Sequence, residues 1–246
     1  MRPALPAAYV VLAAGNVVAQ LTGSEVLDLV TKPLLVPLLL AYLLTGVDRH
    51  SRLVGGTAVA LGFCWLGDLA LMGGDGWFLV GLAAFLAGQV AYCTAFATTW
   101  RRNPIRSRQA LAEPYAAWWV LILVVLGPGL GGLVAPVAVY GAVLCTMAAL
   151  ALGVHRLTAV GALSFVASDS LLAATSLSDG LAFGGDDALV MTTYTVGQAL
   201  IVLGVLAAQP RPAAASADSS APRRALAPPP ADDPKVLGGR PLHDGL

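Results

Sequence analysis

The stretch Gly62-Phe63-Cys64-Trp65-Leu66-Gly67-Asp68-Leu69-Ala70-Leu71-Met72 places a single carboxyl group inside an apolar run. Toward the N-terminus the run continues without another charge as far as Val54, close to the roughly 20 residues that a helix needs to cross a membrane. A carboxylate in hydrocarbon is costly, so an aspartate there is paired, protonated or next to water, and it marks a functional site by default. We therefore expect a membrane-spanning helix over residues 54–72, with Asp68 as a functional residue.

The composition of the whole chain also favours a membrane protein. Of its 246 residues, 57% are hydrophobic and 11% are charged, whereas a soluble domain carries about a quarter charged residues. The 14 basic and 14 acidic residues cancel to zero. This balance argues against nucleic acid as a partner, because binding to phosphates needs a concentrated basic surface.

Neither the cysteines nor the histidines form a metal or disulfide motif. The cysteines lie inside apolar runs without paired spacing, which is typical of small packed side chains. The histidines fall in predicted loops or in the C-terminal segment, away from Asp68. We therefore expect no metal and no cofactor. The residues concerned are Cys64, Cys93, Cys145, His50, His155 and His243.

The hydropathy pattern predicts an all-α, polytopic bundle of eight transmembrane helices. The segment Gly127-Pro128-Gly129-Leu130-Gly131-Gly132 is expected to supply the whole turn between the fifth and sixth spans. The first span is not expected to be a cleaved signal, because Asn16 and Gln20 lie where a signal core is apolar. The spans are expected near residues 4–21, 29–46, 54–72, 77–99, 117–133, 134–152, 159–177 and 188–207.

Basic residues gather on one side of the predicted spans. With the N-terminus in the cytoplasm, 13 of the 14 Lys and Arg residues fall in cytoplasmic loops or the C-terminal segment, and Lys32 is the exception. By the positive-inside rule this predicts cytoplasmic N- and C-termini, in a multi-pass protein that we place in a bacterial cell membrane.

The chain divides by composition after Ala207. The last 39 residues hold half of the 16 prolines and almost no large apolar residues. Such a segment cannot bury enough surface to offset its ordering entropy. We therefore expect a transmembrane domain over residues 1–207 and a disordered, Pro/Ala-rich cytoplasmic tail over residues 208–246.

Two pairs of predicted helices share a polar pattern. Each pair places an aspartate in its first helix and an aromatic-x-x-Gly-Gln sequence in its second. Because the pairs begin four helices apart, they cross the membrane in the same direction, which indicates a parallel four-plus-four repeat. The matching segments are Gly67-Asp68-Leu69 with Phe85-Leu86-Ala87-Gly88-Gln89, and Ser168-Asp169-Ser170 with Tyr194-Thr195-Val196-Gly197-Gln198.

Other polar residues occur in the spans at depths similar to those of Asp68 and Asp169. We expect them to line one cavity that opens toward the non-cytoplasmic side, with Asn16 and Gln20, like Tyr194 and Gln198, paired at i, i+4 on one helix face. Alternative roles remain open: snorkelling for Lys32, helix packing for the small residues and tyrosines, and structural hydrogen bonding for the aspartates. The further residues of this set are Gln89, Tyr92, Cys93, Ser164, Ser168 and Thr175.

The same residues carry a resemblance to the YhhN family of eight-span membrane proteins, over roughly residues 9–207. The family includes lysoplasmalogenases, which hydrolyse the vinyl ether bond of lysoplasmalogen to a fatty aldehyde and a glycerophospho-base. The resemblance implies that Lys32, Asp68 and Asp169 are active-site residues, that the substrate is a lysophospholipid or lysoplasmalogen, and that membrane lipids surround the protein. Relatives commonly have histidine where this chain has Gln89. The similar segments are Lys32-Pro33-Leu34, Gly62 to Met72, Phe78 to Tyr92, Gly161 to Leu172 and Tyr194 to Ile201.

Two carboxyl groups, one protonated and one ionised, could catalyse the hydrolysis of a vinyl ether. Protonation of the β-carbon gives an oxocarbenium ion, which water traps as a hemiacetal that collapses to aldehyde and alcohol. One protonated carboxyl would act as the acid, and one carboxylate would stabilise the cation and activate water, as in glycoside hydrolases. We expect Asp68 and Asp169 to share these roles in an order that the sequence leaves open, and Lys32 to hold one of them ionised or to bind the substrate phosphate. The expected substrate-binding residues are Lys32, Asn16, Gln20, Gln89, Tyr92, Tyr194 and Gln198.

Two other classes of protein also place acidic residues in the membrane. A small-molecule or lipid transporter with a midplane acidic site is the main alternative, although the helices with Asp68 and Asp169 contain no internal proline. An intramembrane aspartyl protease uses two carboxylates, but the Tyr-Asp pair of those enzymes is absent from this chain. Substrate-dependent ion flux in proteoliposomes, without release of aldehyde, would favour the transporter.

Overall fold

The computed structural model describes residues 4–46, 51–177 and 181–209. The described residues belong to one compact unit, Met1–Gln209. The expected disordered tail lies outside the described residues from Pro210 onward, as do Arg2, His50 and His243.

The described residues form helices and no strands, which confirms the all-α prediction. Each predicted span coincides with an α-helix to within four residues at either end. Short 3-10 helices (η1 to η5) occupy the connections before α4, between α4 and α5, and between α5 and α6. The α-helices are α1 (Ala4–Thr22), α2 (Glu25–Thr45), α3 (Arg52–Leu71), α4 (Phe78–Ala97), α5 (Glu113–Leu130), α6 (Val134–Ala151), α7 (Arg156–Leu177) and α8 (Asp186–Ala207).

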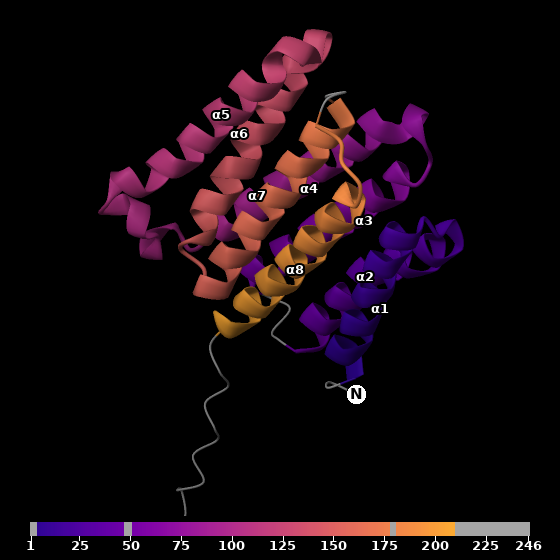
Figure 1. Cartoon of the computed structure of the whole chain (residues 1–246). Helices are drawn as coiled ribbons and strands as arrows, with labels where there is room; N and C mark the ends of the chain where they lie inside the picture. Colours follow the sequence, from indigo (N-terminus) through magenta and orange to yellow (C-terminus); the bar gives the residue numbers. More distant parts are fainter. Residues whose placement is uncertain (1–3, 47–50, 178–180, 210–246) are drawn as a thin grey trace, which may run out of the picture. The chain divides into compact units, whose positions relative to one another are not determined.

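Seven helical stretches in the described part of the chain are long and apolar enough to cross a membrane. Helices α5 and α6 count as one of them, because the chain is helical without interruption from Gln109 to Ala151. The chain nevertheless reverses at Gly131, whose φ of 51° suits glycine, so that α5 and α6 pack side by side (Figure 1). The turn is shorter than the six-residue segment expected, because α5 continues through Pro128 and ends at Leu130.

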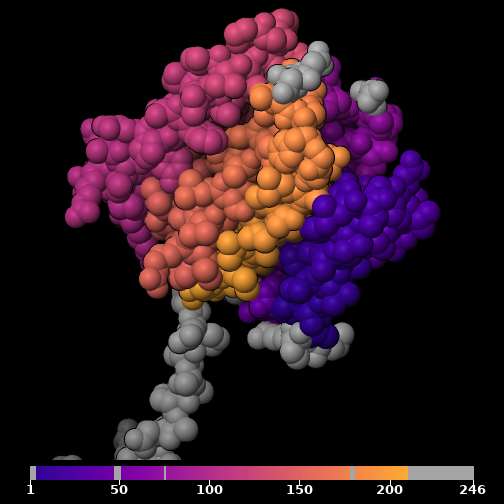
Figure 2. All heavy atoms as spheres, in the orientation of Figure 1, coloured from indigo at the N-terminus to yellow at the C-terminus, as the bar shows by residue number. Residues whose placement is uncertain are grey.

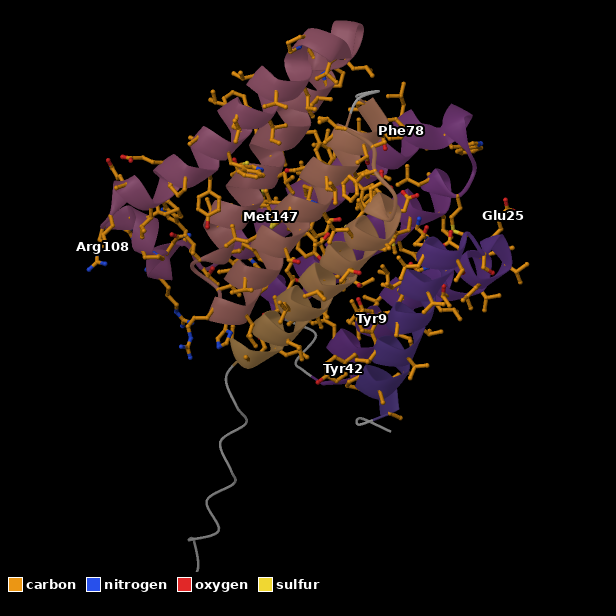
Figure 3. The ribbon with its side chains drawn as sticks, in the orientation of Figure 1. Tyr9, Glu25, Tyr42, Phe78, Arg108 and Met147 are labelled. Atoms are coloured by element: carbon orange, nitrogen blue, oxygen red, sulfur yellow. The ribbon has the colours of Figure 1, made fainter. Side chains whose placement is uncertain are left out.

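The two ends of the bundle carry opposite charge. The helix ends that flank the α2–α3, α4–α5 and α6–α7 connections lie at one end of the bundle, which we call the basic end because every arginine among the described residues lies there. The opposite end, where α2 and α8 begin, is the acidic end. Figure 3 shows Glu25 and Phe78 toward the acidic end, and Tyr42 and Arg108 toward the basic end. The described arginines are Arg52, Arg101, Arg102, Arg106, Arg108 and Arg156.

Helix α8 links the two halves of the bundle. It packs against α7 on one side and against α1 and α2 on the other, and it also contacts α3 (Figures 1 and 2). Its buried residues extend from Ala188 to Val205, nearly its whole length. Side chains on α8 can therefore reach groups that are far apart in the sequence.

Glycines allow the closest helix contacts, as small residues do in membrane bundles. A Cβ atom at Gly161 of α7 would lie 2.7 Å from both the Gly197 carbonyl oxygen and the Ile201 nitrogen of α8. A Cβ atom at Gly67 of α3 would lie 2.7 Å from the ring of Phe85 on α4. These contacts fix the positions of α3 and α7, the two helices that carry Asp68 and Asp169.

Two prolines in α2 shape its contact with α3. Pro37 has no N–H group, so the carbonyl of Pro33 one turn earlier lacks its helical partner. The indole nitrogen of Trp65 donates a hydrogen bond of 2.9 Å to this carbonyl. The bond joins α2 to α3 next to Lys32, the residue that precedes Pro33.

We predict that Gly161→Ala lowers the free energy of unfolding by about 1–3 kcal/mol, because the new methyl group meets backbone atoms that cannot move aside. Gly62→Ala in α3 is the matched control, since a Cβ atom there has no neighbour within 4 Å. Thermal unfolding of the purified protein in detergent measures both variants. Equal stability of the two variants would contradict the close packing of α7 on α8.

Candidate active site

Asp68 lies in the interior of the bundle, with 3% of its surface exposed. Its Oδ2 atom accepts a hydrogen bond of 2.8 Å from the hydroxyl of Tyr194. The two residues are 126 positions apart and meet because α8 runs beside α3. A buried carboxyl in a membrane bundle therefore has a partner from a distant part of the sequence.

The hydrogen bonds continue from Tyr194 to α4. The Gln198 side-chain nitrogen donates to the Tyr194 hydroxyl at 3.4 Å, and the Tyr92 hydroxyl donates to Gln198 Oε1 at 2.6 Å. The expected i, i+4 pair of α8 thus joins Asp68 to Tyr92. We call these four residues, Asp68, Tyr194, Gln198 and Tyr92, the Asp68 network.

Asp169 lies on α7, is half-buried, and has a different partner. Its Oδ2 atom accepts a hydrogen bond of 2.5 Å from the hydroxyl of Tyr140 on α6. Tyr140 is not among the site residues predicted from the sequence. It is a lone tyrosine in an apolar helix, and no spacing pattern in the sequence marks it.

Two apolar pockets flank the Asp169–Tyr140 pair. The first lies toward the acidic end, between α3, α4, α6 and α7. The second lies between α5, α6 and α7. Both share Val137, Tyr140, Asp169 and Ala173 in their walls. The first pocket is otherwise lined by Leu71, Phe78, Leu82, Phe85, Leu172 and Leu177.

Gln89 is fully buried, and neither its amide nitrogen nor its amide oxygen has a hydrogen-bond partner among the described residues. It lies close enough to the Tyr140 hydroxyl for the two groups to interact, although no bond between them meets hydrogen-bond geometry. Leaving such groups unpaired inside a protein costs about 1–3 kcal/mol each. A water molecule or a polar ligand atom beside Gln89 would remove this cost.

Charges link the two aspartates and Lys32. The half-buried Lys32 ammonium and the Asp169 carboxyl both lie within electrostatic range of Asp68. The region around Asp68 therefore combines one cation with three carboxyl groups, those of Asp68, Asp169 and Asp28. The charge of Lys32 influences the Asp68 carboxyl, whereas the Asp169 carboxyl accepts a hydrogen bond from a neutral tyrosine, Tyr140.

Asn16 and Gln20 do not join the Asp68 network. Both donate to Asp28 Oδ1, at 2.7 Å and 2.8 Å, and Asn16 also donates to the Thr31 hydroxyl at 2.9 Å. The structure places their shared face of α1 against the first turns of α2, because α1 and α2 pack together near the acidic end.

Three further residues expected to line the cavity, Ser164, Ser168 and Thr175, donate hydrogen bonds to backbone carbonyl oxygens. Ser164 and Ser168 donate to carbonyl oxygens of α8, and Thr175 donates within α7. The two serines therefore join α7 to α8. In this structure they do not extend the hydrogen bonds of either aspartate.

Comparison with known families matches the sequence to the YhhN family over residues 27–205. The chain belongs to the YhhN family. The matched range contains Lys32, Asp68, Tyr140 and Asp169 and begins after Asn16 and Gln20. This YhhN protein has the apolar helices of an integral membrane protein. Neither the curated proteins nor the solved structures gave a match.

Within the described residues of this YhhN protein, no group of three or more His, Cys, Asp or Glu side chains could hold a metal ion. The polar groups near Asp68 and Asp169 are instead a lysine, tyrosines and amides. These groups can bind an anion, donate hydrogen bonds to carboxylates and orient water.

We predict that Tyr194→Phe lowers the free energy of unfolding by about 1–3 kcal/mol, because it leaves the buried Asp68 carboxyl without its donor. Tyr42→Phe is the control, since Tyr42 lies toward the basic end (Figure 3), whereas Asp68 lies in the last turn of α3, toward the acidic end. Thermal unfolding of both variants in the same detergent checks this prediction. A stability of Tyr194→Phe equal to that of the control would show that the Asp68–Tyr194 bond is not formed.

Proposed function

We propose that this YhhN protein is a membrane-embedded hydrolase that cleaves the vinyl ether bond of lysoplasmalogen, releasing a fatty aldehyde and a glycerophospho-base. The observation that carries the proposal is the pair of intramembrane carboxyls, each of which accepts a hydrogen bond from a tyrosine. One lies within electrostatic range of a lysine, and the other lies in the wall of apolar pockets. Family membership supports the proposal, since the resemblance to lysoplasmalogenases rests on the same aspartates.

The proposal includes eight membrane spans with both termini in the cytoplasm. The separation of α5 and α6 at Gly131 supports eight crossings, and the arginines at the basic end support a cytoplasmic location for that end. A four-plus-four repeat is supported by the similar positions of Lys32 and Tyr140, each on the helix that precedes an aspartate-bearing helix. We place the protein in a bacterial cell membrane.

The apolar walls of the pockets suit the first carbons of the hydrocarbon chain of a lysolipid. Their walls are almost entirely apolar, and their shared polar residues are Tyr140 and Asp169. A chain bound in the first pocket would place its first carbons near Asp169. The vinyl ether is the bond between that chain and glycerol, so it would lie between the two carboxyls, with the polar part of the lipid toward Asp68 and Lys32.

The surroundings of the aspartates suggest how they divide the chemistry. Burial disfavours the ionised form of both carboxyls, and the charge of Lys32 offsets part of this effect at Asp68. We therefore assign the role of carboxylate to Asp68. The Oδ2 atom of Asp169 accepts a hydrogen bond from Tyr140, so its other oxygen, Oδ1, carries the proton. That proton moves to the β-carbon of the vinyl ether, and the oxocarbenium ion forms next to the Asp68 carboxylate.

Water completes the reaction. It adds to the carbon bonded to the ether oxygen, a carboxylate accepts its proton, and the hemiacetal collapses to aldehyde and alcohol, so that one water is consumed for each bond cleaved. The unpaired amide of Gln89 is a group that could hold this water near Tyr140. Gln89 would thus position water without carrying a proton itself.

We predict that Asp68→Asn and Asp169→Asn each reduce aldehyde release from lysoplasmalogen by at least about 100-fold, because positioned acid and base groups typically contribute 10²–10⁴-fold. The measurement is aldehyde release by purified protein in detergent, with Asp186→Asn, an acid at the start of α8, as the matched control. Full activity of both variants would refute the mechanism. Substrate-dependent flux in proteoliposomes without aldehyde release by the wild type would favour a transporter.

We predict a smaller effect for Tyr140→Phe, about 10-fold on kcat with little change in KM, because Tyr140 positions Asp169 without taking part in proton transfer. The pH profile of kcat should shift as well, since the Asp169 carboxyl loses its hydrogen bond. An unchanged kcat together with an unchanged pH profile would show that Tyr140 has no role in the reaction.

A further inference from the structure

A second polar cluster lies at the acidic end, where α1 meets the start of α2. Its centre is Asp28, which is half-buried and accepts hydrogen bonds at Oδ1 from the side-chain amides of Asn16 and Gln20. Thr31 completes the cluster through its bond with Asn16. We call these four residues the Asp28 cluster, and the reaction described above does not use it.

The Asp28 cluster has acceptors without donors. Asn16 is fully buried, and within the part of the chain that the structure describes its Oδ1 atom has no hydrogen-bond partner. The second oxygen of Asp28 accepts no hydrogen bond from a described residue. A group with several N–H donors and a positive charge would satisfy both acceptors and the carboxylate charge at once.

Lys32 lies one turn deeper on the same face of α2 as Asp28. Among the described residues, no acidic group lies within 4.0 Å of its half-buried ammonium. Asp28 instead binds the two amides, and Lys32 and Asp28 both act on Asp68 over a longer distance. A half-buried cation without an ion pair is suited to bind an anionic ligand group.

We propose that the Asp28 cluster and Lys32 form a headgroup subsite for a zwitterionic phosphoethanolamine lipid. Asp28 and the Asn16 amide oxygen accept hydrogen bonds from the primary ammonium, and Lys32 binds the phosphate. This inference rests on the proposed function, because it specifies the headgroup of the same substrate.

The order of charges along the structure matches the order of groups in such a lipid. Asp28 and Lys32 are separated by about 6 Å along the axis of α2, and Asp68 lies beyond Lys32 within its electrostatic range. From the membrane surface inward, ammonium, phosphate and vinyl ether would thus meet carboxylate, lysine and the catalytic carboxyls in turn.

The chemistry of the Asp28 cluster selects a primary over a quaternary ammonium. A primary ammonium carries three N–H donors, which suits unpaired amide and carboxylate oxygens. A quaternary ammonium has no N–H group and is recognised by the faces of aromatic rings. The cluster consists of a carboxylate, two amides and a hydroxyl, so a phosphocholine headgroup would leave the Asn16 oxygen unpaired.

The test measures binding of saturated 1-O-alkyl lysolipids to the full chain in detergent by titration calorimetry. Three headgroups are compared: phosphoethanolamine, phosphocholine and phosphate alone. We expect the wild type to bind the phosphoethanolamine lipid about 10-fold more tightly than the others, the size expected for a charge-assisted hydrogen bond. Asp28→Asn should abolish this preference, whereas Lys32→Gln should weaken binding of all three lipids.

Glu25→Gln is the matched control, because Glu25 is an exposed acid one turn before Asp28 on the same helix. It should keep the wild-type preference. Equal affinity of the wild type for the three lipids, or an unchanged preference in Asp28→Asn, would overturn the subsite. The wild-type comparison needs no variant, so it tests the proposal even if Asp28→Asn is poorly folded.

The binding assay is independent of catalysis, because a saturated ether has no double bond to protonate. Headgroup preference without aldehyde release from lysoplasmalogen would refute the proposed reaction and leave the subsite standing. Aldehyde release without headgroup preference would refute the subsite and leave the reaction standing.

Discussion

A carboxyl group inside a membrane bundle needs a hydrogen-bond partner, and the arrangement of the helices meets this requirement for Asp68. The Tyr194 hydroxyl reaches Asp68 from α8, so α8 must lie beside α3 while it also packs against α1 and α7. The glycine contacts between α7 and α8 and between α3 and α4 permit these approaches. The energetic need of one buried acid thus constrains helices from both halves of the chain.

The same arrangement gives the two aspartates different surroundings. Asp68 is enclosed, belongs to a network of two tyrosines and a glutamine, and lies within range of Lys32. Asp169 is more exposed, pairs with Tyr140 and borders the apolar pockets. Two carboxyls in unlike environments can take the acid and the carboxylate roles that hydrolysis of a vinyl ether requires.

Much of this could be predicted from the sequence, because polar residues in apolar helices are few and their spacing is informative. The i, i+4 pair Tyr194 and Gln198 does join Asp68 to Tyr92. Tyr140 was missed because a lone tyrosine in an apolar helix shows no spacing pattern. Asn16 and Gln20 share the predicted face, but the sequence did not reveal that this face of α1 would lie against Asp28.

The most direct test of proton transfer from an intramembrane carboxyl to carbon is lysoplasmalogen hydrolysis by the purified protein in heavy water, with the aldehyde analysed by mass spectrometry. The account predicts one deuterium on the carbon next to the carbonyl, and no labelled product from the Asp169→Asn variant. Aldehyde without deuterium on that carbon, or labelled aldehyde formed equally well by Asp169→Asn, would contradict it.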